Sequence, residues 1–394
     1  MRAYWFAAGA VAAFVVLELL LRAAGYSSPV WYAPHPQLGW TLRPEASGWF
    51  SAEGRSYVQI SPTGRRDREH ALAKPPATYR IVVLGDAYSE AMQVPLEKAY
   101  WAQLPARLAA CGFQPGKRIE VLNFGVRDYG TAQQLLVLEG DAIRYRPDLV
   151  LLQISHGNDL RDNSRALDVV GGRPYFTLDE NGALRLDDSF LSGARYRGWA
   201  SAPRQALREL ADSFRAVQLA RSMVRQLKAV QTAHADSGEN PAGLEVGALT
   251  PPRDARWQEA WRITEALIAS MQELASRNGA HLAVVTVPFA MQVHPDARRR
   301  EALQSELGVA DFAYPERRFA AFAERQGALA VTLWPEMQAL ALANGSTLYG
   351  FDNAEPGSGH WNDPGSALSK PYNVEPLARA SACISGHKVT ASAP

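Results

Sequence analysis

The sequence has few cysteines and no excess of charge of either sign. Among its 394 residues the cysteines are Cys111 and Cys383, and 41 Lys and Arg balance 40 Asp and Glu, for a formal net charge of +1. No basic block stands out, so nucleic acid is not expected as a partner. In an exported protein two cysteines often pair. Two isolated buried thiols fit the sequence equally well, and both interpretations stay open.

Clusters of metal-ligating residues are also missing. His281 and His294 have no partners at metal-ligand spacing, so no metal and no other cofactor is expected. No internal repeat or long low-complexity tract occurs, which argues against a repeat architecture. With 47% hydrophobic residues, the chain can bury a full core.

One long apolar run lies at the N-terminus. Every residue from 4 to 21 is apolar or small except Glu18, and a helix of about 17–25 such residues can span a bilayer. Arg2 precedes the run and favours a cytoplasmic N-terminus, while Arg22 on the far side weakens that orientation. Residues 1–24 are therefore expected to form an uncleaved anchor, and the main domain is expected to be exported. A cleaved signal peptide and a buried core helix are the alternatives.

Residues 25–78 and the segments that follow differ in pattern. Residues 25–78 are rich in Pro, Gly, Ser and aromatics, and stretches such as SYVQI predict short strands beside the main domain. Beyond them apolar strands alternate with helices; the strands are expected in YRIVVLGDA, RIEVLNFGV, PDLVLLQISHGND, HLAVVTVPF and GALAVTLWP. Such continuous apolar runs suit a parallel sheet covered on both faces, and the alternation predicts an α/β fold.

The α/β pattern is interrupted between about residues 161 and 252, which we expect to be an insertion or a lid. This segment predicts a hairpin around Asn181-Gly182 and a helical stretch over about 203–230. A long amphipathic helix follows, and its aromatic stripe is expected to pack in the core. The main domain is then expected over residues 79–366, with a C-terminal tail at 367–394.

Small or polar residues stand where three predicted strands end, and a further group lies near the C-terminus. The strand ends carry Gly85-Asp86-Ala87, Asn123-Phe124-Gly125 and Gly157-Asn158-Asp159, and the late group is GSGHWND, with His360. In an open parallel sheet, chemistry takes place beyond the carboxyl ends of the strands. These four elements are therefore expected to converge on one site.

In their order along the chain, these elements resemble the SGNH (GDSL-type) hydrolases: a GDS-like turn, Gly after the second strand, Gly-Asn-Asp after the third and a late His. The resemblance covers residues 79–365 apart from the insertion. It implies a flavodoxin-like three-layer α/β/α sandwich. The anchored layout and the His-Trp pair also resemble envelope polysaccharide O-acetyltransferases and their esterase relatives. That implies a bacterial inner-membrane protein, single-pass, whose main domain lies in the periplasm or outside the cell.

The resemblance implies a role for four residues. The nucleophilic Ser would fall at Ala87, and His360 would be the general base. The backbone amides of residue 87 and Gly125 and the side-chain amide of Asn158 would form the oxyanion hole. The chemistry requires these types, because a hydroxyl needs a base to take its proton and a tetrahedral oxyanion needs preorganised donors.

The sequence departs from the family pattern at the same site. Ala87 has no hydroxyl and cannot form an acyl-enzyme. The Asp that usually stands two or three residues before the His is replaced by Ser358 and Gly357. The second-strand motif Gly-Val-Ser-Gly-Tyr-Gly reads GVRDYG, with Arg127 and Asp128 at positions of small residues.

Nearby residues offer partial substitutes. Ser89 lies two residues beyond the nucleophile position, about 200° around a helix, so its hydroxyl is expected to point elsewhere and to satisfy helix-end amides. Asp352 or Asp363 could orient the general base from a loop. Asp86 is expected to organise the turn, and His156 either lines the pocket or is a satisfied strand-end residue.

The sequence thus predicts an SGNH-type ester hydrolase or O-acyltransferase scaffold for acyl esters of envelope carbohydrate, with activity impaired by the missing nucleophile. An acyl-ester or carbohydrate ligand and a membrane are the expected partners. The alternative is an inactive pseudoenzyme that binds a glycan or a protein in envelope assembly. A structural protein that has inherited the fold without a site ranks last.

Overall fold

A five-stranded parallel sheet forms the centre of the molecule. The computed structural model describes residues 2–224, 244–351 and 359–362. The strands are β5 (Thr78–Leu84), β6 (Arg118–Asn123), β7 (Leu149–Ser155), β10 (His281–Val287) and β11 (Leu329–Thr332), paired in the order β11-β10-β7-β5-β6. All four pairings are parallel. Counted along the chain this order is 2-1-3-4-5, the flavodoxin-like order, so the expected fold is confirmed.

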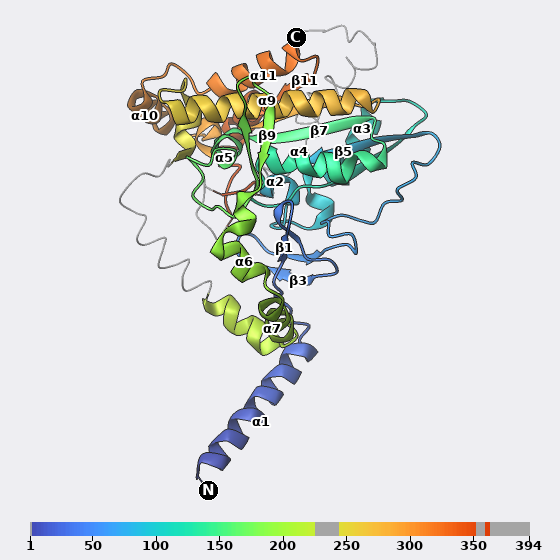
Figure 1. Cartoon of the computed structure of the whole chain (residues 1–394), viewed down its shortest axis with the longest axis vertical. Helices are drawn as coiled ribbons and strands as arrows, with labels where there is room; N and C mark the ends of the chain where they lie inside the picture. Colours follow the sequence, from blue (N-terminus) through green and yellow to red (C-terminus); the bar gives the residue numbers. More distant parts are fainter. Residues whose placement is uncertain (1, 225–243, 352–358, 363–394) are drawn as a thin grey trace.

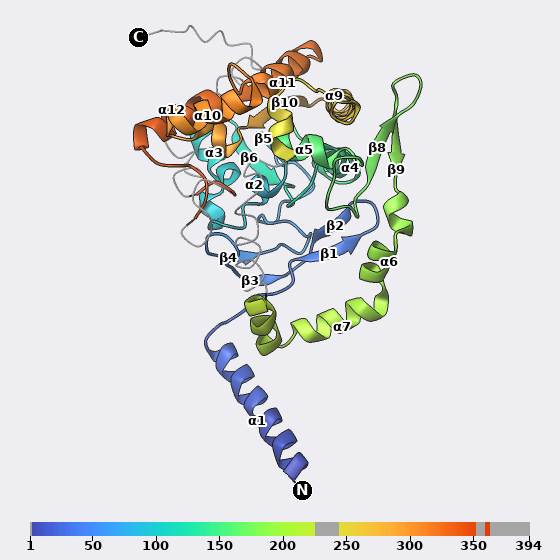
Figure 2. The ribbon, with the colours of Figure 1, turned by 90° about the vertical axis from the view of Figure 1, so that its left-hand side faces the viewer.

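Helices cover both faces of this sheet (Figures 1 and 2). The core on one face includes residues of α3 (Tyr100–Ala110) and α12 (Trp334–Asn344). The core on the other face includes residues of α4 (Thr131–Gly140), α9 (Ala255–Arg277) and α11 (Tyr314–Arg325). Strands β5 and β7 are buried along their whole length, because helices from both layers press on them. This arrangement is the predicted three-layer α/β/α sandwich.

The long helix α9 shows why its sequence folds in this way. Asp254 caps its N-terminus by accepting hydrogen bonds from the backbone N–H groups of Arg256 and Trp257. Trp261 is fully buried and packs its ring against Tyr314 and Phe319 at centroid distances of 5.8 and 4.8 Å. The aromatic stripe is therefore core, as expected.

The N-terminal extension forms two hairpins beside the sandwich. Strands β1 (Tyr32–His35) and β2 (Gly39–Leu42) pair antiparallel, as do β3 (Ser47–Phe50) and β4 (Ser56–Gln59). Arg66, at the end of this extension, is 1% exposed and donates to the backbone carbonyls of Glu90, Ala91 and Val94. The extension is thus fastened to the segment that follows β5.

The insertion between β7 and α9 holds the predicted hairpin and a broken helix. Strands β8 (Tyr175–Leu178) and β9 (Leu184–Asp187) pair across a turn in which Gly182 has φ +77°, and helices α6 (Ala194–Ala200) and α7 (Ala202–Asp212) follow. The helical stretch expected over about 203–230 is confirmed for its described part, where a break after Asp212 separates α7 from a second helix that covers residues 215–224. In Figure 2, α6 and α7 run along the side of the body toward α1.

The remaining elements are the N-terminal helix α1, helix α10, two short helices and several 3-10 turns. They are α1 (Arg2–Ala23), α2 (Ala87–Glu90), α5 (His156–Asp162) and α10 (Ala297–Leu307), with 3-10 turns η1 (Leu96–Lys98), η2 (Ala142–Tyr145), η3 (Ser189–Ser192), η4 (Leu244–Leu249) and η5 (Ala290–Val293). Helix α1 contains a 20-residue stretch, Tyr4–Ala23, of mean hydropathy 2.0 that is long and apolar enough to cross a membrane. It projects from the body (Figure 1).

Cys111 is exposed at the end of α3. Cys383 lies outside the described residues, so a pairing of the two stays a prediction.

Replacing Arg66 with Met tests how the extension is held. The change leaves three buried carbonyls without their donor, at about 1–3 kcal/mol each. We expect urea unfolding to report a loss of at least about 3 kcal/mol in the free energy of unfolding. Arg68→Met, two residues away at an exposed position, is the matched control and should change stability little. Equal losses in the two variants would contradict the role of Arg66.

Candidate active site

The turn after β5 places residue 87 at the start of a helix, facing a cavity. Asp86 is the N-cap of α2, and its Oδ1 accepts a hydrogen bond of 3.0 Å from the Tyr88 N–H. Its expected role in organising the turn is confirmed. Gly85 has no room for a side chain, because a Cβ there would lie 2.3 Å from Oε1 of Gln153. Ala87, the first residue of α2, lines the cavity.

Ser89 does not face this cavity. Its side chain is fully buried, and its Oγ lies 2.7 Å from the Tyr100 hydroxyl and 2.9 Å from Oε1 of Gln153. The expectation that its hydroxyl points elsewhere is confirmed. The role expected for it is wrong, because the hydroxyl binds two side chains and no amide at the helix end. Ser89 cannot replace the missing nucleophile in this arrangement.

Helix α5 begins where β7 ends and brings Asn158 to the same cavity. Strands β5 and β7 are neighbours at the point where the strand order reverses, which is where open α/β sheets form their crevice. The side-chain amide of Asn158 has no hydrogen-bond partner among the described residues. It is therefore available to donate to a bound oxygen.

A short C-terminal segment places His360 on the opposite side. The backbone of His360 accepts a hydrogen bond from the Gly350 N–H at 2.9 Å, and Tyr349 and Trp361 form a β-bridge. Trp361 is 5% exposed, and its ring lies 4.9 Å from that of Tyr88. The imidazole lies 5.1 Å from the same tyrosine ring. These contacts fix the position of the imidazole at the cavity.

Glu53, which sequence reasoning missed, holds the imidazole from the N-terminal extension. Its carboxylate contacts Nδ1 of His360 through Oε2 and accepts from the His360 backbone N–H at 2.5 Å through Oε1. Burial would raise the pKa of Glu53, but the hydrogen bonds and charge of His360 lower it overall. Asp352 and Asp363, the acids considered from the sequence, lie outside the described residues.

Gly359 makes this contact possible. Its φ is +76°, in the left-handed region that favours glycine, and a Cβ would lie 2.4 Å from Oε1 of Glu53. Any side chain at this position would push the carboxylate away from the imidazole.

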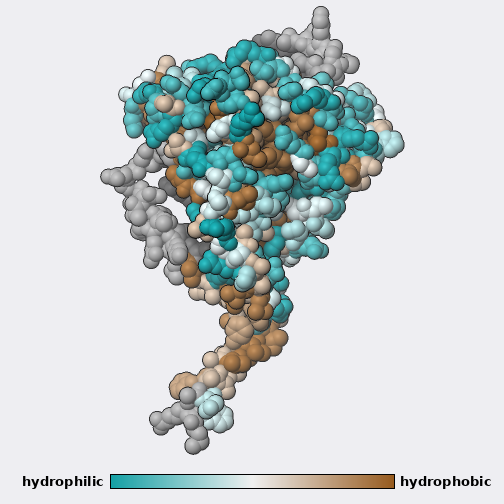
Figure 3. All heavy atoms as spheres, viewed as in Figure 1, coloured by the Kyte–Doolittle hydropathy of each residue, from teal (hydrophilic) through white to brown (hydrophobic). Residues whose placement is uncertain are grey.

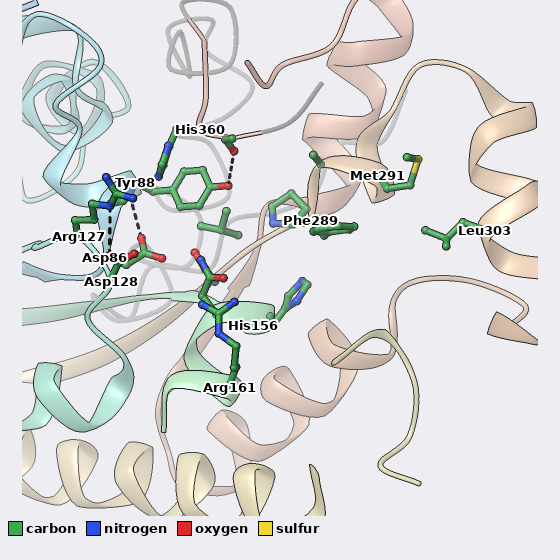
Figure 4. Close-up of a pocket in the computed structure, with 18 of the residues that line it drawn as sticks. Asp86, Tyr88, Arg127, Asp128, His156, Arg161, Phe289, Met291, Leu303 and His360 are labelled. Atoms are coloured by element: carbon green, nitrogen blue, oxygen red, sulfur yellow. Dashed lines mark hydrogen bonds and ion pairs between the residues drawn. The ribbon is translucent and has the colours of Figure 1, made fainter. Parts of the chain in front are cut away.

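The cavity between these elements has a volume of about 570 Å³. Figure 4 shows Tyr88 and His360 on one side and Phe289, Met291 and Leu303 on the other. Arginines from three elements, Arg127, Arg161 and Arg299, also line it. Within the insertion, no described residue beyond Arg161 lines the cavity, and the expectation of a lid stays a prediction.

Gly125 is not brought to the site with the other three predicted residues. It does not line the cavity, and its N–H donates to Oδ1 of Asn123 at 2.9 Å. A Cβ on Gly125 would lie 2.4 Å from Cβ of Ser89. The glycine is therefore required by close packing against α2, not by the approach of a substrate.

Asp128, from the same turn, lies at the cavity where Gly125 was expected. It lines the cavity, and its φ of +59° lies in the region that glycine prefers. Its backbone N–H has no acceptor among the described residues. Position 128 corresponds to the second glycine of the family motif Gly-Val-Ser-Gly-Tyr-Gly, so the sequence contained a signal for this position.

A buried carboxyl supports the turn that carries Arg127 and Asp128. Oε1 of Glu90 accepts a hydrogen bond of 3.2 Å from the Arg127 N–H, and both carboxylate oxygens accept from the Tyr32 hydroxyl at 3.0 and 2.8 Å. Burial raises the pKa of Glu90 to about 7, and these hydrogen bonds and the charges of Arg127 and Arg66 only partly offset that rise.

Two further acids lie beneath the site. Burial raises the pKa of Asp86. Burial raises the pKa of Asp159 as well, and the nearby charge of Asp86 adds to the effect. Both groups thus favour the protonated form more than an exposed carboxyl does, which reduces the negative charge below the cavity.

His156 lines the cavity and is also held by partners. It is 2% exposed, and its Nε2 lies 3.1 Å from Oε1 of Gln292 and 3.2 Å from Oε1 of Glu316. The expectation that it lines the pocket is confirmed. The expectation of a satisfied histidine holds only for Nε2, because Nδ1 is buried without a hydrogen-bond partner among the described residues. No group of three or more metal-ligating side chains occurs within the described ranges.

Comparison with known proteins finds similarity only to solved structures of low sequence identity. No family model matches the sequence, and no curated protein does. Among solved structures, the chain is similar to TesA (16% identity, 77% of this chain and 99% of that one, TM-score 0.35). It is also similar to the acetyl xylan esterase AlAXEase (13%, 77% and 98%, TM-score 0.36) and to a GDSL-like lipase from Bacteroides thetaiotaomicron (13%, 79% and 92%, TM-score 0.33). At these TM-scores the similarity carries no argument about this chain. The strand order shows a flavodoxin-like α/β fold, and what the site does must come from its own residues.

The raised pKa of Glu90 predicts a pH dependence of stability. Because the folded-state pKa of about 7 exceeds the unfolded value of about 4.3, the contribution of Glu90 is complete below the unfolded pKa and is lost as pH rises through 7. Glu90→Gln keeps an acceptor for Tyr32 but does not titrate. Between pH 4.5 and pH 8, urea unfolding should show that the native chain loses on the order of 3 kcal/mol more than the variant. Identical pH profiles would refute the assignment.

Proposed function

We propose that this chain is an SGNH-type ester hydrolase or O-acyltransferase scaffold that binds acyl esters of envelope carbohydrate, and that Ala87 keeps it from forming an acyl-enzyme. The proposal rests chiefly on one observation. The His360–Glu53 pair faces the same cavity as residue 87 and Asn158. An imidazole base held by a carboxylate and an amide donor for the oxyanion are the groups that acyl transfer requires besides the nucleophilic hydroxyl.

The chemistry of the cavity follows from the atoms that line it. With a hydroxyl at residue 87, its oxygen would attack the acyl carbonyl carbon while Nε2 of His360 takes the proton. Glu53, on Nδ1, would stabilise the imidazolium that forms. The backbone N–H groups of residues 87 and 128 and the amide of Asn158 are the donors for the oxyanion. Collapse of the tetrahedral intermediate would break the bond to the alcohol oxygen of the ester, and the His360 imidazolium would return its proton to that leaving oxygen. Water or a sugar hydroxyl would then attack the acyl carbonyl carbon, His360 would take its proton and return it to the residue-87 oxygen, and the acyl group would leave residue 87.

The wall of the cavity fits an amphipathic ligand. Its apolar side, with Phe289, Met291 and Leu303, suits an acyl or methyl group. Arginines on the other walls can donate hydrogen bonds to sugar hydroxyls or carboxylates. We assign the body to the periplasmic or outer face of a bacterial inner membrane, anchored by α1.

A second candidate function is that of a pseudoenzyme that binds a glycan or a protein partner in envelope assembly. It is favoured by Arg127 and Asp128, whose side chains pair at 3.3 Å and line the cavity at positions of small residues in the family motif. If these groups obstruct the approach of an ester, the cavity binds without turnover even when a hydroxyl is present.

Restoring the hydroxyl separates the two functions. Ala87→Ser should produce hydrolysis of p-nitrophenyl acetate well above that of the native chain, measured as kcat/KM at pH 8. Adding Glu53→Gln should reduce the gained rate by as much as about 10⁴-fold, because the imidazole loses its orienting charge. Glu180→Gln, an exposed acid in the β8–β9 turn, is the matched control and should leave the gained rate unchanged.

If the Ala87→Ser variant is folded but its kcat/KM for p-nitrophenyl acetate does not exceed that of the native chain, the hydrolase scaffold is wrong and the pseudoenzyme is favoured. A gain that Glu53→Gln leaves intact would show that the imidazole acts without Glu53, and the assigned base pair would be wrong.

A further inference from the structure

Helix α7 carries an apolar stripe that the body does not cover. Leu207 and Leu210 are 66% and 60% exposed, and with Ala211 they share one face at i, i+3 and i+4 spacing. Arg204 and Arg208 border that face on one side, where the Arg208 guanidinium also donates to the Trp199 carbonyl at 3.4 Å. A helix with an exposed apolar stripe bordered by arginines has the composition of a helix that lies in a membrane interface.

The opposite side of α7 is fastened to the body by charge. Asp212 is 6% exposed; its Oδ2 pairs with Arg43 at 2.6 Å, and its Oδ1 accepts from the Val30 N–H at 3.1 Å and from Arg221 at 3.0 Å. Polar contacts therefore hold α7 to the protein, and its apolar side is turned outward.

The helix at residues 215–224 continues this apolar surface beside α1. Met223 and Val224 are 54% and 51% exposed. At its start, the rings of Phe214 and Phe14 lie 5.6 Å apart, although Phe14 belongs to the apolar stretch of α1. In Figure 3 the hydrophobic surface of α1 continues onto the lower end of the body.

Glu18, the single charged residue in the apolar run, finds its partners in this junction. Its Oε2 accepts from the Ala216 N–H at 2.9 Å, so it caps the helix at 215–224, and its Oε1 pairs with Arg22 at 2.7 Å. Arg22 also donates to the Ser213 carbonyl at 2.7 Å. These bonds offset the cost of a carboxylate in the span. They also bind α1 to the folded body, which a cleaved leader would not do.

We infer that α7 and residues 213–224, here called the platform, lie on a phospholipid bilayer where α1 leaves it. Glu18 stands five residues before the end of the apolar stretch at Ala23, a rise of about 7.5 Å. Interfacial helices are buried to about 5–10 Å, so the platform meets α1 at the depth that such a helix occupies. The apolar side chains enter the acyl-chain region, and Arg204 and Arg208 reach the headgroup phosphates. The inference rests on the proposed anchor and not on the chemistry of the cavity.

The test measures the depth of single residues in the full chain. The starting chain carries Cys111→Ser and Cys383→Ser, so that it has no native cysteine. A single cysteine is then introduced and labelled with an NBD fluorophore, in four separate variants: Leu207→Cys, Leu210→Cys, Val11→Cys and Leu186→Cys. Each protein is reconstituted into phosphatidylcholine–phosphatidylglycerol vesicles. Quenching by lipids brominated on the acyl chains is compared with quenching by iodide in the water. Val11 reports the anchor, and Leu186 on β9, 50% exposed, is the water-exposed control.

We expect labels at 207 and 210 to be quenched several-fold more by brominated lipid than the label at 186, and several-fold less by iodide. If the labels at 207 and 210 show the same quenching by lipid and by iodide as the label at 186, while lipid quenches the label at 11, the proposed position of the platform is wrong and the anchor stands. A label at 11 that is not quenched by lipid would overturn both. Protection of 207 and 210 from both quenchers would mean that protein, such as a second copy, covers the stripe, and would also overturn the inference.

Discussion

The contact between the Glu53 carboxylate and His360 is the interaction on which the rest of the site depends. It joins an N-terminal hairpin to a C-terminal segment and gives the imidazole a fixed tautomer and direction. A glycine adjoins each of the two residues in the sequence. Gly359, before His360, leaves room for the carboxylate of Glu53. Gly54, after Glu53, has φ +63°, and a Cβ there would lie 2.5 Å from the Gln93 carbonyl oxygen. The N-terminal extension is therefore part of the site and not an accessory to the sandwich.

The same extension connects the site to the anchor. Residues 25–59 run from the end of α1 through both hairpins to Glu53 and β4, and Arg66 ties their continuation to the segment after β5. Under the proposed function, the His360–Glu53 pair, the side-chain amide of Asn158 and the cavity form an acyl-transfer site that lacks its nucleophile. Arg127 and Asp128 then alter the wall that a substrate meets.

The sequence was sufficient for the sheet and for most of the site, and the failures have physical causes. Continuous apolar runs located all five strands, and Ala87, Asn158 and His360 line one cavity as their motif order implied. Glu53 could not be found, because it lies 307 residues from its partner and no local spacing links them. The break in the helical stretch of the insertion after Asp212 was not foreseen, because the residues that hold it, such as Glu18 and Arg22, are distant in the sequence.

The measurement that tests the central claim most directly is covalent labelling of the Ala87→Ser chain with a fluorophosphonate, followed by intact mass. The account predicts addition of one phosphonyl group to the introduced serine, at a rate that falls when Glu53→Gln is added, and no addition to the native chain. A variant that is folded but gains no mass would show that residue 87 and His360 do not form a nucleophile–base pair, and the reading of the cavity as an acyl-transfer site would be wrong.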